Sequence, residues 1–234
     1  MPIYNIDMAT KLEEFDNLAT IFKNHGYRLF LVGGTVRDYL LGEELTDMDA
    51  VSDATPIEIE TFLNDADFTF KRFGSVKYKS NGVKFDITTM RKENQYEDSR
   101  HPLKIEFIKD LSVDVIRRDF TINAMYLDDE HQVIDYVGGQ NDLINRLLRM
   151  VGNPLDRIKE DPLRIIRAIR FAIDYDLSFD EELEKTIKEN ISLLDKLNPE
   201  KIKQDLKKIK CSDKTKIVTM LNKFNITHLM NVIE

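Results

Sequence analysis

The feature that most restricts the possible folds is a short apolar run, Leu29–Val32, followed at once by Gly33 and Gly34. An apolar run bounded by glycine is typical of a buried strand. The next residues, 35–41, favour a short helix that Gly42 ends. Glycines between a strand and a helix let backbone amides approach phosphate oxygens at the positive end of the helix. The alternative is a tight turn in which the glycines meet only a steric need.

The following segment, 46–51, alternates in polarity and predicts a second strand. Asp47 and Asp49 would project from the same face of it, because side chains alternate across a strand. Two carboxylates so close repel each other unless a cation lies between them, and Mg²⁺ prefers such oxygen ligands. A third carboxylate, Asp86, lies in the middle of a later strand-forming segment, residues 83–88, where it could also simply face solvent. Three acids on neighbouring strands would suit two-metal phosphoryl transfer.

Two later segments combine cations with hydrogen-bond acceptors. Residues 117–124, Arg-Arg-Asp-Phe-Thr-Ile-Asn-Ala, offer cations for phosphate and an acid and amide for ribose hydroxyls. Within 160–171, an acid and three arginines recur every third residue along one helix face: Asp161, Arg164, Arg167 and Arg170. Neighbouring arginines favour a bound anion, and an Asp–Arg pair can read a base edge. Surface ion pairs are the alternative for both segments.

The remaining pattern separates a mixed α/β part from a helical part. Helical spacing predicts a helix over 8–24, closed by Gly26, and Thr55-Pro56 starts another over 57–64. Asn81-Gly82 is typical of a hairpin turn. Strands are expected over residues 68–73, 76–79, 83–90, 125–127 and 133–136, a loop over 91–104 and a short helix over 118–124. From about residue 156 onward the pattern is helical, with a break at Asn198-Pro199.

Composition restricts the setting in which the chain works. The net charge of −8 argues against a protein that coats nucleic acid without specificity. Residues 198–224 nevertheless carry eight lysines and three acids, which fits either a solvated helix face or a surface that faces RNA. The single cysteine, Cys211, fits a reducing cytosol. No apolar run approaches the roughly 20 residues of a membrane span, so we expect a cytoplasmic protein without a membrane partner.

Together these segments resemble the class II tRNA nucleotidyltransferase (CCA-adding enzyme) and bacterial poly(A) polymerase family, over roughly residues 29–179. The motifs that carry the resemblance are Gly33-Gly34-Thr35-Val36-Arg37-Asp38, Leu40-Leu41-Gly42, Asp47-Met48-Asp49, Arg117–Ala124, Asp135–Gly139 and Glu160–Arg164. Residues 96–102 are similar to the flexible loop of the family. The resemblance implies an α/β head over 1–140 with a five-stranded, polymerase-β-like nucleotidyltransferase sheet. An all-helical neck over 141–197 and a short helical remnant of the RNA-binding body over 198–234 would follow.

The resemblance also implies a reaction, the template-independent addition of CMP and AMP from CTP and ATP to the tRNA 3′ end. Asp47 and Asp49 would bind Mg²⁺, with Asp86 as a third, supporting carboxylate. Gly33, Gly34 and Arg37 would hold the triphosphate of the nucleotide, and Asp119 would contact its ribose. Asp161 and Arg164 would read the base, and Arg167 and Arg170 would assist through phosphate or stacking contacts. Arg118 and Asn123 would complete the nucleotide-binding set.

Three alternatives stay open: an enzyme that adds only A, a poly(A) polymerase, and a catalytically silent RNA-binding homologue. Family members usually continue further, with helices that grip the elbow of tRNA, where this sequence has only residues 201–234. The transferase chemistry is therefore better supported by the sequence than the identity of the RNA.

Overall fold

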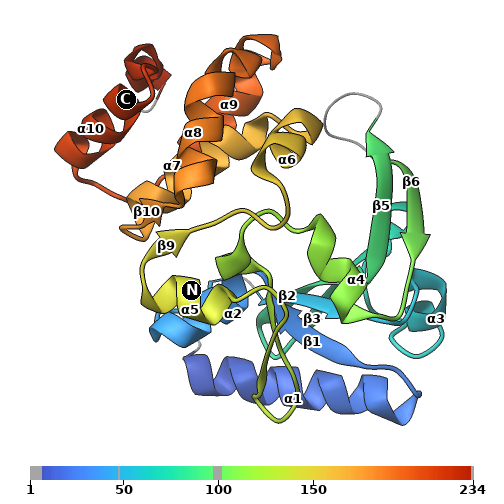
Figure 1. Cartoon of the computed structure of the whole chain (residues 1–234). Coiled ribbons are helices and arrows are strands. Elements are labelled where there is room, and N and C mark those ends of the chain that lie inside the picture. The colour runs from blue at the N-terminus through green and yellow to red at the C-terminus, as the bar shows by residue number, and fades with distance from the viewer. Residues whose placement is uncertain (1–6, 47, 97–101, 233–234) are drawn as a thin grey trace. The chain divides into compact units, whose positions relative to one another are not determined.

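The computed structural model describes residues 7–46, 48–96 and 102–232, without the side chains of 94–104 and 230–232. The chain divides into two compact units (Figure 1). The first comprises residues 1–95, 103–118 and 122–139, and the second comprises residues 96–102, 119–121 and 140–234.

A mixed sheet forms the centre of the first unit. Among the described residues it has six strands, one more than the resemblance implies, in the order β3-β4-β2-β1-β7-β8. The strands are β1 (Leu29–Val32), β2 (Met48–Ser52), β3 (Ser75–Ser80), β4 (Val83–Thr89), β7 (Met125–Leu127) and β8 (Val133–Asp135). β2 and β4 run parallel, whereas the other neighbouring pairs are antiparallel. The strands predicted at 29–32 and 125–127 have the expected bounds.

One face of the sheet is covered and the other is partly open. Along β4, buried residues alternate with exposed or half-buried ones, so that Phe85 and Ile87 are buried while Asp86 is exposed. Helix α1 (Met8–Asn24) packs along the sheet (Figure 1) and buries Phe15 and Phe22. Its bounds are those that the helical spacing predicts. The alternation therefore separates a core face from a face that can hold polar side chains.

Short elements connect the strands. Helix α2 (Gly34–Leu41) follows β1 and ends at left-handed Gly42, as predicted. Helix α3 (Pro56–Glu60) begins with a capping box between Thr55 and Glu58, so its start is confirmed although it ends before residue 64. Helix α4 (Leu111–Asp114) precedes 3₁₀ turns at Val115–Arg117 and Thr121–Asn123.

Three predictions for this region are wrong. The expected strand over 68–73 is replaced by a 3₁₀ turn at Lys71–Phe73, because only Asp67 pairs with the edge strand β3. At both ends of the expected loop over 91–104 the chain forms strands, β5 (Arg91–Tyr96) and the start of β6 (Pro102–Phe107), which pair with each other. Their mutual pairing satisfies backbone groups that a loop would leave to solvent. The centre of that segment, 97–101, where a flexible loop was expected, lies outside the described residues. The expected helix over 118–124 is interrupted because Phe120 forms a β-bridge with Met150.

The second unit is mainly helical, as predicted. Its elements are most of α5 (Gly139–Ile144), then β9 (Leu147–Leu148), α6 (Pro154–Glu160), α7 (Leu163–Asp174), β10 (Ser178–Phe179), α8 (Glu181–Asn190), α9 (Pro199–Leu206) and α10 (Lys214–Lys223), with 3₁₀ turns at Ile191–Lys196 and Thr227–Val232. Asn198 caps α9 at the predicted break. The small parallel pair of β9 and β10 was not predicted. Within the described part of the chain, no helix is long and apolar enough to cross a membrane.

The hairpin turn between β3 and β4 gives a first test of the fold. Asn81 and Gly82 both have positive φ, 45° and 87°. Replacing Gly82 with Ala is expected to destabilise the protein by about 1–2 kcal/mol, because an L-residue is strained there. Urea unfolding would measure the loss, with Ser80→Ala in the same hairpin as the control. An unchanged midpoint for Gly82→Ala would contradict this turn.

Candidate active site

The parallel register of β2 and β4 brings two of the predicted acids together. Asp49 lies directly beside Asp86, and neighbouring strands are about 4.8 Å apart. Directly paired residues project from the same face, and the side chain of Asp86 is 50 % exposed there. The Nζ of Lys77 lies 3.4 Å from Asp86 Oδ1 and supplies part of the opposite charge. Asp47, the other predicted magnesium ligand, lies outside the described residues.

The glycine turn lies against Asp49, and its two glycines are required for different reasons. Gly33 has φ +72° and ψ −135°, a conformation that L side chains rarely adopt. A Cβ on Gly34 would come within 3.2 Å of the Arg37 guanidinium. The hydroxyl of Thr35, which was not predicted as a site residue, accepts a 2.9 Å hydrogen bond from the Asp49 amide. The turn therefore fixes the start of the strand that carries Asp49.

Arg37 is buried beneath this turn and is fully engaged with protein groups. Its Nε donates to Asp38 Oδ1 at 2.9 Å, and its Nη1 donates to the side-chain oxygen of Asn123. A buried guanidinium is costly unless it is paired in this way. The fold thus brings together Arg37 and Asn123, two predicted nucleotide-binding residues that are far apart in the sequence.

Arg118 belongs to a buried network around Asp114, an acid that sequence reasoning missed. Arg118 Nη2 lies 2.7 Å from Asp114 Oδ2, Arg117 Nε lies 2.8 Å from Oδ1, and the Tyr126 hydroxyl donates to Oδ2 at 2.9 Å. Burial alone would raise the pKa of Asp114, but Arg118, Arg117 and the Arg91 amide outweigh burial and lower the pKa to about 2. The spacing of Asp114 from the two arginines, three and four residues, could have revealed these pairs.

In the second unit, Asp119 and Arg167 form an ion pair in which two guanidinium nitrogens donate to one carboxylate oxygen. Arg167 Nε donates to Asp119 Oδ2 at 2.9 Å, and Nη2 donates to the same oxygen. Burial would raise the pKa of Asp119, yet the Arg167 charge outweighs burial and lowers the pKa. These two predicted nucleotide-binding residues, 48 positions apart, are therefore held together before any ligand arrives.

The other predicted residues of α7 have distinct surroundings. Asp161 Oδ1 accepts a hydrogen bond from the amide of Leu163, the first residue of α7, at 3.0 Å. Arg164 is buried, and its Nη1 donates to Glu160 at 2.9 Å and also to the Arg157 carbonyl. The guanidinium of Arg170 lies 4.7 Å from the centre of the Phe171 ring. The three arginines of α7 (Arg164, Arg167 and Arg170) thus mostly contact protein groups and are not freely exposed.

The residues of the first unit fit a divalent cation. Asp49 and Asp86 offer hard oxygen donors from adjacent strands, on a partly open face. In the described ranges no cluster of three or more His, Cys, Asp or Glu could hold a metal, so a complete ligand set would require Asp47 or groups from a substrate. Magnesium is often bound in that way, by one or two carboxylates together with phosphate oxygens and water.

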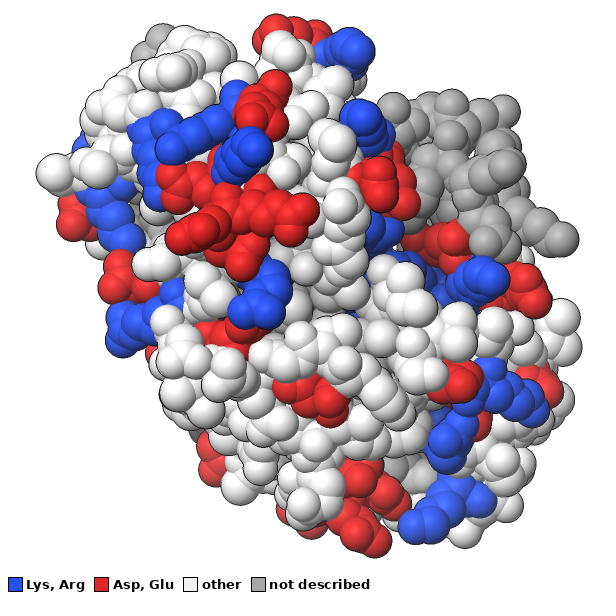
Figure 2. Space-filling view, viewed as in Figure 1, with Lys and Arg blue, Asp and Glu red and all other residues white. Residues whose placement is uncertain are grey.

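The lysine-rich segment of the second unit is partly neutralised. Lys208, Lys216 and Lys223 each form an ion pair, with Asp205, Asp176 and Glu184 respectively. Acidic and basic side chains are interleaved on the face in Figure 2. Contact of this segment with RNA stays a prediction.

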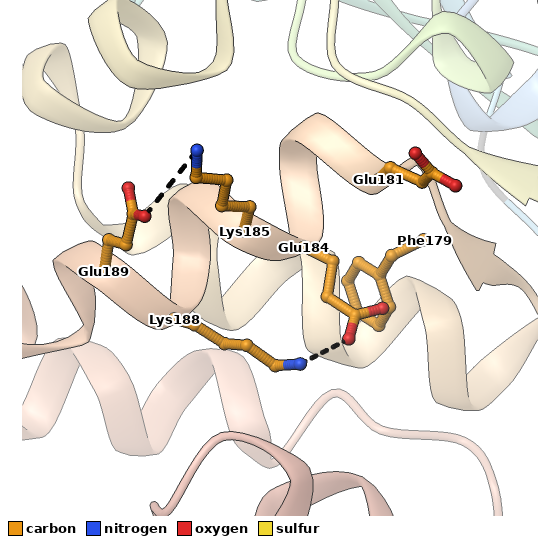
Figure 3. A pocket seen from close by; sticks show the side chains of 6 residues that line it. All are labelled: Phe179, Glu181, Glu184, Lys185, Lys188 and Glu189. Atoms are coloured by element: carbon orange, nitrogen blue, oxygen red, sulfur yellow. Dashed lines mark hydrogen bonds and ion pairs between the residues drawn. The ribbon is translucent and has the colours of Figure 1, made fainter.

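A pocket of 470 Å³ lies elsewhere in the second unit and contains none of the predicted site residues. Its lining residues are Phe179, Glu181, Glu184, Lys185, Lys188 and Glu189 (Figure 3). Lys188 pairs with Glu184 at 2.6 Å and Lys185 with Glu189 at 3.9 Å. Its charges are therefore mostly compensated within the helix.

Comparison with known proteins identifies the family. The model of the poly A polymerase head domain matches residues 29–149, from β1 to β9. The chain belongs to this family. The match includes both carboxylate strands, the glycine turn and the Arg117–Ala124 segment, so the resemblance seen in the sequence is confirmed.

Curated relatives are CCA-adding enzymes. The chain is 42 % identical over 184 residues to that of Limosilactobacillus reuteri (strain DSM 20016), covering 79 % of this chain and 46 % of the relative. It is 38 % identical over 185 residues to that of Bacillus pumilus (strain SAFR-032), with the same coverage of 79 % and 46 %. The chain thus spans about half the length of the curated relatives it matches.

Solved structures share the fold. The CCA-adding enzyme of Bacillus stearothermophilus in complex with CTP has a TM-score of 0.84 at 27 % identity, over 92 % of this chain and 53 % of that chain. The enzyme of Thermotoga maritima complexed with tRNA has a TM-score of 0.76 at 26 % identity, over 98 % and 54 %. The predicted fold class, an α/β nucleotidyltransferase head followed by helical parts, is confirmed.

The buried acid predicts how stability responds to pH. The pKa of Asp114 is lower in the folded state, so its stabilising effect is present above the ordinary value of 3.8 and lost as pH falls toward about 2. Asp114→Asn should lower stability at pH 7, and wild type should lose about 2 kcal/mol more than this variant between pH 5 and 2. Urea unfolding across this range is the measurement, with the nearby exposed Ile116→Asn as control. If the free energy of unfolding changed with pH in the same way for wild type and Asp114→Asn, the ion pairs proposed to stabilise Asp114 would be contradicted.

Proposed function

We propose that this chain carries the catalytic head and neck of a template-independent nucleotidyltransferase that adds CMP and AMP to the tRNA 3′ end. Residues 1–140 would be the head, 141–197 the neck and 198–234 part of an RNA-binding body. The observation that carries the proposal is the placement of Asp49 beside Asp86, next to the glycine turn, in a chain of this family. Solved relatives in complex with CTP, tRNA and an ATP analogue support it. Such a reaction fits the predicted cytoplasmic location.

In the head, the proposed roles follow from the described contacts. Asp47, Asp49 and Asp86 would hold Mg²⁺, which would supply charge for activating the RNA 3′ hydroxyl and for stabilising pyrophosphate. Gly33 and Gly34 would bring backbone amides to the triphosphate. Arg37, held by Asp38 and Asn123, would place positive charge under the same turn. Thr35 would act indirectly by fixing the Asp49 backbone.

In the neck, Asp161 and Arg164 would select the base. The hydrogen bonds of Arg164 within the described residues use Nη1, which leaves Nε and Nη2 for a base edge. The ion pair between Asp119 and Arg167 would hold an acceptor for a ribose hydroxyl in a fixed position. Arg170, lying on Phe171, would contribute a phosphate or stacking contact, and Arg118 would support the adjoining segment through Asp114.

The second candidate function is the addition of A alone, either as an A-adding enzyme or as a poly(A) polymerase. The matching family model is that of a poly A polymerase head domain, which favours keeping this candidate. The two functions share the transfer chemistry and differ in the nucleotides accepted and in the length of the product.

Incubation of the chain with a tRNA that lacks its CCA end separates these functions. With labelled nucleotides offered singly and together, CCA addition predicts incorporation of CMP first and then a single AMP. Incorporation of AMP alone onto the truncated tRNA would support the second candidate. Incorporation of neither, with retained tRNA binding, would indicate a catalytically silent homologue.

Substitution of one carboxylate tests the catalytic assignment. Asp49→Asn is expected to lower the rate of nucleotide incorporation by about 10³-fold, because the amide keeps the shape but removes the charge that holds the metal. The control is Asp129→Asn, which removes an exposed acid that pairs with Lys23. Circular dichroism and the melting temperature would show that both variants fold. Retained activity in Asp49→Asn would exclude this residue as a metal ligand.

A further inference from the structure

Two lysines oppose each other directly on the β3–β4 hairpin. Lys79 pairs with Lys84 in the antiparallel register, and both residues are exposed. Like charges in directly opposed positions destabilise a sheet. Among the residues that the structure describes, neither lysine has an ion-pair partner, whereas Lys77 on the same strand pairs with Asp86 at 3.4 Å. The Lys79–Lys84 pair is therefore a repulsive contact that a bound anion would relieve.

The lysine pair lies on the same face as the carboxylates. In the β3–β4 register, Lys77 pairs with Asp86 and Lys79 with Lys84, so the two pairs are two residues apart along the strands, roughly 7 Å. Residues separated by two positions project from the same face. Asp86 in turn lies beside Asp49 on β2. Lys79 and Lys84 therefore lie on the same face as Asp86, two residues away from it along the β3–β4 hairpin.

Protection of the sheet edge does not account for this pair. Lysines are common on edge strands, where they oppose pairing with another chain. Lys79 lies on β3, which is an edge strand, but Lys84 lies on β4, which is paired on both sides by β3 and β2. Edge protection would also not require both lysines to share the face of the carboxylates.

The strand order separates the Lys79–Lys84 pair from the glycine turn, where the triphosphate is proposed to bind. The order β3-β4-β2-β1 places the glycine turn, which follows β1, on one side of β2 and the lysine pair on the other. The triphosphate is assigned to the glycine turn. The other anionic reactant of the proposed function, the RNA, approaches the carboxylates with its 3′ hydroxyl and carries a phosphate on each preceding nucleotide.

We propose that Lys79 and Lys84 bind the backbone phosphates of the RNA next to its reacting 3′ end. The proposal rests on the proposed function, because it assigns the second substrate of the same site. Lysine contacts to phosphate release counterions, so they strengthen binding without reading sequence and weaken as salt rises. The pair would guide the 3′ end toward Asp49 and Asp86 from the β4 side.

The test compares Lys79→Gln/Lys84→Gln with wild type in two measurements. In the transfer assay, the KM for truncated tRNA should rise about tenfold at 0.1 M salt, while the KM for CTP should stay within about twofold. In an anisotropy titration with labelled tRNA, the slope of log affinity against log salt should fall in magnitude by about 1–2. Lys79→Arg/Lys84→Arg should restore both values. Lys23→Gln/Lys71→Gln, which removes two exposed lysines elsewhere in the first unit, should leave both unchanged.

The outcomes separate this proposal from the proposed function. An unchanged salt slope and an unchanged KM for tRNA would overturn the lysine assignment even if transfer is normal. A rise in the KM for CTP instead would assign the lysines to the triphosphate and also overturn it. If wild type transfers no nucleotide, the proposed function fails, and a lower salt slope in the glutamine variant would still show that these lysines bind RNA phosphate. The melting temperature should not fall in the glutamine variant, because a repulsive pair has been removed.

Discussion

Two carboxylates on adjacent strands repel each other, and the parallel register of β2 and β4 places Asp49 directly beside Asp86. The residues around Asp49 hold it in this position beside Asp86. Gly33 brings the chain past Asp49 in a conformation that other residues rarely adopt, and Thr35 holds the Asp49 amide. Lys77 compensates part of the charge. The fold thus maintains a concentration of negative charge on a face where a cation and a phosphate can reach it.

The positive groups are arranged in the opposite way, since most of them are bound by protein acceptors. Arg37 is held by Asp38 and Asn123, Arg118 by Asp114, and Arg167 by Asp119. Fixed donors lose little freedom when a ligand binds, and buried guanidinium groups need such partners. Lys79 and Lys84 differ because they oppose each other, which makes them suited to a mobile anionic partner.

Much of the fold could be predicted from the sequence because local signals agreed with tertiary packing. Helix α1, strand β1 and the hairpin at Asn81-Gly82 each follow from periodicity or turn chemistry. Strand β5 could not be predicted, because its sequence, Arg91–Tyr96, is polar and shows no apolar alternation. In β6, apolar residues do alternate at Leu103, Ile105 and Phe107, but most of this pattern lies beyond the polar segment that was expected to be a loop.

The candidate site was predictable to a similar degree. Its acids and glycines stand in recognisable motifs, but their contacts depend on residues far apart in the chain. Asp114 is an example, because its burial beside Tyr126 is created by the sheet and not by neighbouring residues. The joining of Asp119 to Arg167 likewise depends on how α7 packs within the second unit.

Electron paramagnetic resonance can test directly whether Asp49 and Asp86 bind one cation together. Titration of Mn²⁺ in place of Mg²⁺ into the full chain reports the free ion, and therefore the affinity and the number of sites. We predict that Asp49→Asn and Asp86→Asn each weaken Mn²⁺ binding at least about tenfold, because each removes a charged ligand from the same ion. Asp129→Asn should bind as wild type does. Unchanged Mn²⁺ affinity in both site variants would contradict a shared cation site at Asp49 and Asp86.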